Sequence, residues 1–194
     1  MKKLDFSFRT NLAATQGCLL LSDPFTQDPY FTRSVILLCR HNEHETFGFV
    51  LTNHVEIDLN TLAKNLPNIN AKVSIGGPVD ENNLYFIHTL GDKIKGTQHI
   101  AGKLCFGGDS ELLFRFLIEN PEYISNVRFF IGYSGWDYKQ LKEEMKENAW
   151  IAVNNIPEND LFTSSATDFW KACMIKQGVK FEMISKFPLN PNDN

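Results

Sequence analysis

Two short segments of the chain carry residues that are suited to recognising a charged ligand. Arg33 follows a proline-containing turn that includes Asp23 and Asp28, and Gly76, Gly77 and Pro78 follow a strand-like run. A guanidinium group pairs with a carboxylate through two parallel hydrogen bonds. The simpler interpretation is therefore an ion pair between Arg33 and one of the two aspartates, which would pin the turn.

The alternative interpretation places Arg33 beside an anion. Two consecutive glycines can expose their N–H groups as an anion-binding concavity, so Gly76 and Gly77 would complete such a site. His88 ends the following strand-like run and would act as acid or base. This combination predicts an enzyme acting on a small anionic substrate, although a Gly-Gly-Pro sequence equally marks a turn.

A second candidate surface is the sequence Gly-Tyr-Ser-Gly-Trp at 132–136. The apolar run 127–131 predicts a strand before it and a charged pattern predicts a helix after it, so we expect a tight turn between them. Tyr133 and Trp136 offer flat rings with polar tips, suited to gripping a ligand or partner, and Gln140 lies where the helix begins. Alternatively, the rings fill the end of a barrel-like sheet and the glycines merely admit them.

Cys39, His41 and His44 have the residue types of a zinc site. They lie at a predicted hairpin tip, however, and no second Cys or His pair has clear ligand spacing. Solvated histidines are the simpler interpretation, and we expect no metal and no cofactor. Nucleophile-elbow, P-loop and dinucleotide-binding motifs are missing, and Glu143 and Glu144 lie in a charged helical pattern that predicts solvated side chains.

The composition argues against a nucleic-acid or membrane surface. The chain has 194 residues, a net charge of −4 and a pI near 5.7, whereas nucleic acids and anionic membranes attract concentrated Lys and Arg. No apolar run approaches the ~20 residues that cross a bilayer, and the N-terminus lacks an apolar signal core. We therefore expect a cytoplasmic protein with buried, reduced thiols. The four cysteines are Cys18, Cys39, Cys105 and Cys173.

Strand and helix patterns are interleaved without a regular βαβ period. Two apolar, β-branched runs flank the polar stretch 41–46 and predict a hairpin. The mixture predicts an α+β fold, with a strongly bent, mixed and barrel-like sheet and helices packed outside. We expect a tail or short helix over 1–16, a single domain over 17–184 and a loose tail over 185–194. The remaining predicted strands are 17–21, 72–75, 84–90, 104–106 and 150–153, and the remaining helices are 59–66, 110–120, one after residue 140, and 167–177.

Downstream of the aromatic segment 132–136, the chain has Gln140, Leu141, Glu144 and Trp150. This succession resembles the signature of the YqgE/AlgH family of bacterial proteins, a Gly-Tyr-Ala-Gly-Trp segment followed by a helix start and a strand. Ser134 replaces the usual Ala, and the family's Gly-Pro-Gly before the helix is replaced as well. Further blocks similar to the family lie at 17–24, 28–35, 48–51 and 73–79, with His88 after a strand.

The resemblance implies a compact α/β fold with a barrel-like sheet, without established cofactor or catalytic residues. The family's loose label is transcriptional regulator. We predict a non-enzymatic binding or regulatory protein that holds an unknown small ligand or protein partner at the corner formed by the 22–33 turn, the Gly76-Gly77-Pro78 loop and the Tyr133/Trp136 segment. A direct DNA-binding regulator and an enzyme acting on a small anionic substrate are the alternatives, and the oligomeric state stays open.

Overall fold

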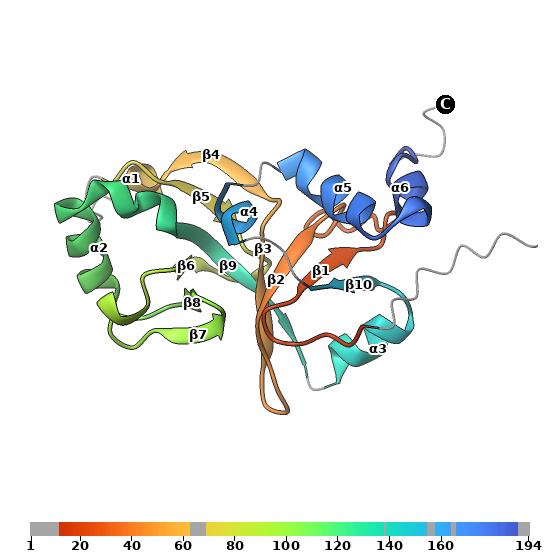
Figure 1. Ribbon diagram of the computed structural model, residues 1–194, viewed down its shortest axis with the longest axis horizontal. Coiled ribbons are helices and arrows are strands. Elements are labelled where there is room, and N and C mark those ends of the chain that lie inside the picture. Colours follow the sequence, from red (N-terminus) through yellow and green to blue (C-terminus); the bar gives the residue numbers. More distant parts are fainter. Residues whose placement is uncertain (1–11, 63–68, 138, 155–157, 164–165, 190–194) are drawn as a thin grey trace, which may run out of the picture.

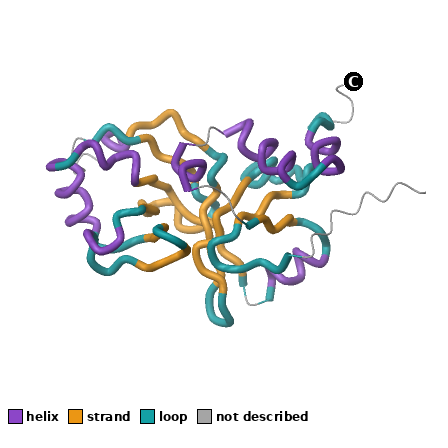
Figure 2. The backbone as a smooth tube through the Cα atoms, viewed as in Figure 1, coloured by secondary structure: helices purple, strands orange, loops and turns teal. Residues whose placement is uncertain are grey.

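A computed structural model describes residues 12–62, 69–137, 139–154, 158–163 and 166–189. Their strands form one strongly curled sheet with helices around it (Figures 1 and 2). The strand order is β10–β1–β2–β3–β9–β6–β8–β7, and β5 pairs with β4 and, in parallel, with β9. The strands are β1 (Leu19–Ser22), β2 (Val35–His41), β3 (Thr46–Val50), β4 (His54–Asp58), β5 (Lys72–Ile75), β6 (Val79–His88), β7 (Gln98–Ala101), β8 (Leu104–Phe106), β9 (Val127–Trp136) and β10 (Trp150–Val153). The helices are α1 (Leu59–Leu62), η1 (Gly91–Lys93), α2 (Ser110–Glu119), η2 (Pro121–Asn126), α3 (Gln140–Lys146), α4 (Glu158–Thr163), α5 (Ala166–Lys176) and α6 (Val179–Ser185).

The first strands are buried on both faces, which explains their continuous apolar sequences. Successive side chains of a strand point to opposite faces. Leu19 and Leu21 accordingly join a cluster with Trp170 of α5, whereas Leu20 joins a second cluster with Leu141 of α3. Helices α5 and α6 therefore cover one face of this part of the sheet, and α3 covers the other (Figure 1).

The far edge of the sheet curls back towards its beginning. The side-chain amide of Gln16 donates hydrogen bonds to the carbonyls of His99 and Ile100 on the edge strand β7, at 3.1 and 3.2 Å. The guanidinium of Arg40 on β2 also lies 5.3 Å from the ring centroid of Phe106 on β8. These contacts confirm the predicted fold class, a single α+β domain built on a strongly bent, mixed sheet.

The aromatic segment 132–136 is not a turn, so that prediction was wrong. It is the second half of β9, which continues to Trp136 and pairs there with Thr46 of β3. Gly132 has a φ of 65°, and a Cβ atom on it would lie 2.6 Å from the carbonyl oxygen of Gly77. The glycine thus lets the backbones come close together, so that pairing continues where a side chain would end it.

Several predicted elements are confirmed. The hairpin is β2–β3, and Asp109 caps α2 by accepting a hydrogen bond from the N–H of Leu112 at 2.9 Å. Strands β4 and β7 and helices η1, η2, α4 and α6 were missed. Part of the predicted 59–66 helix and most of the predicted N-terminal tail fall outside the described residues. Within the described ranges, no helix has the length and apolar character required to span a membrane.

Candidate functional site

A pocket of about 620 Å3 opens where the turn after β1, the residue before β6, the end of β9, α3 and the start of β10 meet. The predicted candidates Asp23, Asp28, Pro78, Trp136 and Gln140 all line it, so the structure brings these five residues together. We call it the acidic pocket. The described residues that line it are Ser22, Asp23, Phe25, Thr26, Asp28, Phe31, Pro78, Gly135, Trp136, Gln140, Glu144, Glu147, Ala149 and Trp150.

Two aspartates shape the turn that forms one wall of the acidic pocket. Oδ1 of Asp23 accepts a hydrogen bond from the N–H of Phe25 at 2.7 Å, and Oδ1 of Asp28 accepts one from the N–H of Tyr30 at 2.8 Å. Such side-chain to backbone bonds explain why Asp before Pro is typical of turns. The other carboxylate oxygen of each aspartate has no hydrogen-bond partner among the residues that the structure describes, so both charges remain open to a ligand.

The opposite wall is held by one carboxylate and two tryptophans. Oε2 of Glu144 accepts hydrogen bonds from the indole N–H groups of Trp136 and Trp150, at 2.8 and 2.7 Å. Its Oε1 accepts one from the amide of Gln140 at 2.8 Å, and the Gln140 carbonyl accepts one from the N–H of Asp137. Glu144 was predicted to be solvated, and this was wrong. Glu144 instead fixes both rings, because a helix places residues 140 and 144 on one face directly after Trp136.

The pocket combines negative charge with aromatic rings. Four carboxylate side chains line it, and no Lys, Arg or His does among the described residues. The ring of Trp150 makes edge contacts with the rings of Trp136 and Phe31, at centroid distances of 5.9 and 5.5 Å, and the ring of Phe25 is 52% exposed at the rim. Carboxylates and aromatic faces both attract cations, so the pocket is chemically suited to an ammonium or guanidinium group.

Arg33 does not form the predicted ion pair. Its guanidinium lies over the ring of Trp170, 5.3 Å from the centroid, and donates a hydrogen bond to the carbonyl of Phe187. Within the described part of the chain, neither Asp23 nor Asp28 lies within ion-pair distance of it. Backbone bonds made by the aspartates themselves stabilise the turn, and Arg33 instead attaches the C-terminal segment to it.

Arg128 is buried in the fold, and the sequence analysis did not single it out. Its side chain donates to the carbonyl of Leu161 at 2.7 Å and to the hydroxyl of Ser74 at 3.1 Å, and also to the carbonyl of Leu51. Burial lowers the pKa of Arg128 from its ordinary value to about 10. Arg128 ties β9 to β5, to the segment after β3 and to α4, and serves the fold.

Gly76 and Gly77 allow two backbones to approach closely and do not offer a free concavity. The N–H of Gly76 donates to the carbonyl of Ile131 at 2.8 Å, as part of the sheet. A Cβ atom would lie 2.3 Å from the carbonyl oxygen of Gly132 at position 76, and 2.4 Å from Ser134 Oγ at position 77. Because the N–H of Gly76 already donates to the carbonyl of Ile131, it is not available to bind an anion, and the structure does not support the anion-binding interpretation of this loop.

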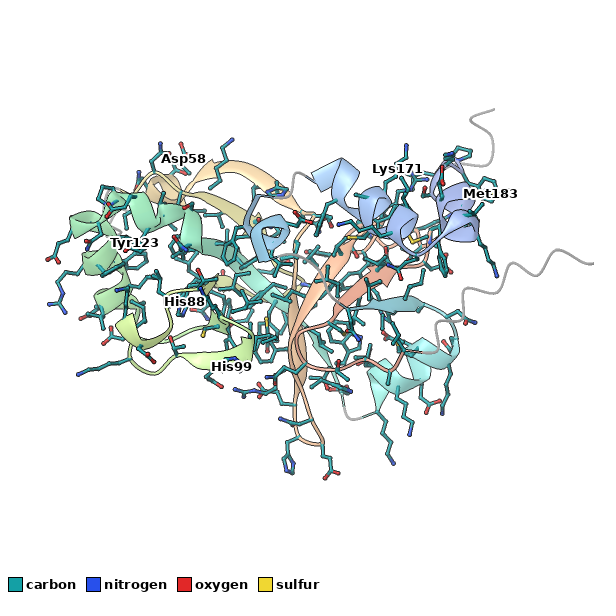
Figure 3. All side chains as sticks on the ribbon, in the orientation of Figure 1. Asp58, His88, His99, Tyr123, Lys171 and Met183 are labelled. Carbon is teal, nitrogen blue, oxygen red and sulfur yellow. The ribbon has the colours of Figure 1, made fainter. Side chains whose placement is uncertain are left out.

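His88 is buried in the other half of the molecule, which carries α2 and β6–β8 (Figure 3). Its Nδ1 accepts a hydrogen bond from the N–H of Leu90 at 3.2 Å, so Nε2 carries the proton and donates to the carbonyl of Gly107 at 3.0 Å. Burial lowers the pKa of His88 below its usual value. The structure thus does not bring His88, Arg33 and the two glycines to one site.

Tyr133 and Trp136 lie on opposite faces of β9. The ring of Tyr133 packs against Phe47 and Tyr85, at centroid distances of 5.8 and 5.6 Å, on the face covered by α5. Trp136 belongs to the cluster on the α3 face. The extended backbone causes this separation, and only Trp136 lines the acidic pocket.

The Cys39, His41 and His44 group does not converge. Cys39 is fully buried, Nδ1 of His41 lies 2.9 Å from the hydroxyl of Thr46, and His44 is exposed on the hairpin tip. No group of three or more His, Cys, Asp or Glu side chains in the described part of the chain is arranged to hold a metal ion. All four cysteines are free and buried, as predicted, and burial raises the pKa of Cys173 to about 12.

The sequence analysis missed Phe25, Phe31, Glu147 and Trp150 as residues of the pocket. The spacing of Gln140, Glu144 and Glu147 by four and three residues could have indicated one acidic helix face. No local pattern places that face beside residues 23–31, because the pairing of β1 with β10 brings together segments that are far apart in the sequence.

Comparisons with known proteins agree over almost the whole chain. A family model described as AlgH-like matches residues 19–182. A UPF0301 protein of Parabacteroides distasonis is 37% identical over 178 residues, covering 91% of this chain and 89% of its own. A UPF0301 protein of Cytophaga hutchinsonii is 33% identical over 181 residues, covering 93% and 99%. These names state no activity.

Two solved structures share the fold. The solution structure of the AlgH protein from Pseudomonas aeruginosa has a TM-score of 0.69 and 23% identity, covering 93% of this chain and 98% of that one. A crystal structure of a Corynebacterium diphtheriae protein has a TM-score of 0.72 and 22% identity, covering 92% and 95%. The family model and the relatives above 30% identity together place this chain in the YqgE/AlgH family, whose members carry the name UPF0301.

Proposed function

We propose that this protein is a non-enzymatic binding protein whose acidic pocket holds a cationic side chain of a protein partner. The observation that carries the proposal is the lining of the pocket: Asp23, Asp28, Glu144 and Glu147 around aromatic rings, with no basic side chain among the described residues. An Arg or Lys side chain would place its charge against the open oxygens of the aspartates and its stem against Phe25 or Trp150.

The residues predicted for an enzymatic site, Arg33, Gly76, Gly77 and His88, are not among the described residues that line this pocket. Glu144 already accepts three hydrogen bonds, and His88, the predicted acid or base, bonds to the backbone of its own half. A regulatory role of this pocket would run through the bound partner, because the carboxylates that line it repel the phosphates of DNA. We also propose a cytoplasmic location, which the four free thiols support.

The binding test compares two capped tripeptides, Gly-Arg-Gly and Gly-Glu-Gly, by isothermal titration calorimetry. We expect saturable binding of the arginine peptide alone, weakening as salt rises. Glu147→Gln removes one exposed carboxylate and Phe25→Ala removes the ring at the rim, and each should weaken binding about fivefold. Glu122→Gln on η2, outside the pocket, is the matched control. Equal affinity for both peptides, or an unchanged affinity in Glu147→Gln and Phe25→Ala, would contradict the proposal.

Direct DNA binding is tested by fluorescence anisotropy with a labelled duplex at two salt concentrations. We expect no saturable binding even at low salt. Binding that weakens as salt rises would reveal a phosphate-contacting surface and would favour direct regulation.

A further inference from the structure

A second cavity, of about 670 Å3, lies on the other side of α3. Its walls are the tip of the β2–β3 hairpin and the outer edge of α3, and residues 12–14 lie along it. Figure 1 shows the hairpin extending from the body of the molecule beside α3. We call this cavity the hairpin groove. Trp136 lies between the two cavities and lines both.

The floor of the hairpin groove is apolar. Trp136 and Leu141 are 9% and 2% exposed, and Ala14 and Met145 pack against the same cluster. Leu12, at the rim, is 45% exposed. Small-molecule sites in proteins are clefts of about 300–1,000 Å3 with mainly apolar walls and a few placed polar groups. The groove has this size and this character, so an apolar chain can lie along its floor.

Lysines line the α3 side of the groove. Lys142 and Lys146 are spaced by four residues, which places them along one edge of α3, and Lys139 lies immediately before the helix. Lys142 is exposed and forms no ion pair with a carboxylate in the described part of the chain, whereas Lys146 contacts Glu143 at 2.6 Å. The hydrogen bond from Lys146, together with the charges of Lys142 and Lys139, lowers the pKa of Glu143. The α3 edge is therefore positive.

The hairpin side carries two of the three acidic side chains that line the groove among the described residues. Glu45 is already ion-paired with Arg40, and Glu43 lies at the exposed hairpin tip. Asp137 follows β9 and lies just before α3, at the opposite end of the helix from Lys146. A negatively charged headgroup is accordingly attracted to the α3 edge and repelled from the tip, which fixes the direction in which an amphipathic anion would lie.

We propose that the hairpin groove binds an amphipathic carboxylate of the fatty-acid class, with its chain on the apolar floor and its carboxylate beside Lys142 on α3. The acidic pocket is unsuited to this ligand, because the carboxylates of Glu144 and Glu147 line that pocket from the opposite side of α3. Helix α3 thus separates a cation-binding surface from an anion-binding one. This second site is independent of the function proposed for the acidic pocket.

The test is calorimetric titration of the full chain with dodecanoate below its micelle concentration. Dodecyltrimethylammonium, which has the same chain and the opposite charge, is the matched probe. We expect saturable binding of dodecanoate and none of the ammonium compound. Lys142→Glu should weaken dodecanoate binding about tenfold, and Leu12→Asp should weaken it by placing a negative charge at the apolar rim. Lys171→Glu on α5, far from the groove in Figure 3, should leave it unchanged.

A variant of the acidic pocket serves as a further control for the hairpin groove. Phe25→Ala, which alters the acidic pocket and does not line the hairpin groove, should bind dodecanoate as the unchanged protein does. Equal binding of the ammonium compound, absent binding of dodecanoate, or an unchanged affinity in Lys142→Glu would overturn the proposal. Lys142 and Leu12 are exposed, so loss of folding does not confound these variants.

Discussion

Replacing Glu144 by Leu should destabilise the protein measurably. The carboxylate of Glu144 accepts hydrogen bonds from the indoles of Trp136 and Trp150, which are 9% and 7% exposed. Each buried donor left without an acceptor costs about 1–3 kcal/mol. The acidic pocket opens beside both indoles, so water can partly replace the carboxylate, and we take the lower end, about 2 kcal/mol for the pair. In a chain of this size that corresponds to a fall in melting temperature of about 4–8 °C.

Two further variants separate charge from hydrogen bonding. Glu144→Gln keeps a carbonyl oxygen that can accept from both indoles but loses the charge, and neutral hydrogen bonds are roughly half as strong as charged ones. We expect it to lose about 1 kcal/mol. Glu143→Leu makes the same change one residue away, where the carboxylate contacts the exposed Lys146, and should leave stability unchanged.

The assay is equilibrium unfolding in urea, followed by far-UV circular dichroism because the substitutions alter tryptophan emission directly. The free energy of unfolding should be highest for Glu143→Leu, lower for Glu144→Gln and lowest for Glu144→Leu. Its dependence on urea concentration should be the same in all three. An unfolding midpoint of Glu144→Leu equal to that of the unchanged protein would refute the account of the two indoles.

Two other substitutions test the backbone contact at Gly77 and the buried state of His88. Gly77→Ala puts a Cβ atom 2.4 Å from backbone atoms of Tyr133 and should lower the free energy of unfolding by about 3 kcal/mol. Gly91 has a φ of 46° and no atom within 4 Å of an added Cβ, so Gly91→Ala should lower it by only about 1 kcal/mol in the same urea titration. Equal losses in the two variants would contradict the close contact at Gly77. For His88, the folded-state pKa lies below the ordinary value of 6.5, so the unfolded chain binds more protons and stability should fall as pH drops through 6.5, levelling off below the folded-state pKa. His88→Gln should reduce this fall between pH 7 and pH 5, and an unchanged pH dependence in the variant would show that His88 is not its source.

Local sequence patterns determined several elements of the fold. The hairpin is specified by β-branched runs around a polar tip, α2 by its aspartate cap, and the 23–31 turn by its Asp-Pro pairs. Each depends on hydrogen bonds and periodicities within a few residues of the chain. The prediction of a turn at 132–136 was wrong, because the glycines there do not form a turn. They let the backbone of this segment come close to the distant residues 76–79.

The fold brings together only some of the residues that were expected to form one site. Asp23, Trp136 and Gln140 share a pocket, as expected, but Arg33 contacts Trp170, and His88 is buried in the opposite half. These placements follow from strand pairings between residues more than a hundred positions apart, such as Leu19 with Val153. Sequence proximity therefore said little about which charges would meet.

The sequence by itself determined the family, the fold class and the acidic, aromatic composition of the segments that form the pocket. Only the tertiary structure decided that these segments meet without a basic side chain among the described residues, and that α3 presents carboxylates to one cavity and lysines to the other. The physical reason is that helix and strand periodicity fix which residues share a face. What that face opposes is set by the curl of the whole sheet, to which all of its strands contribute.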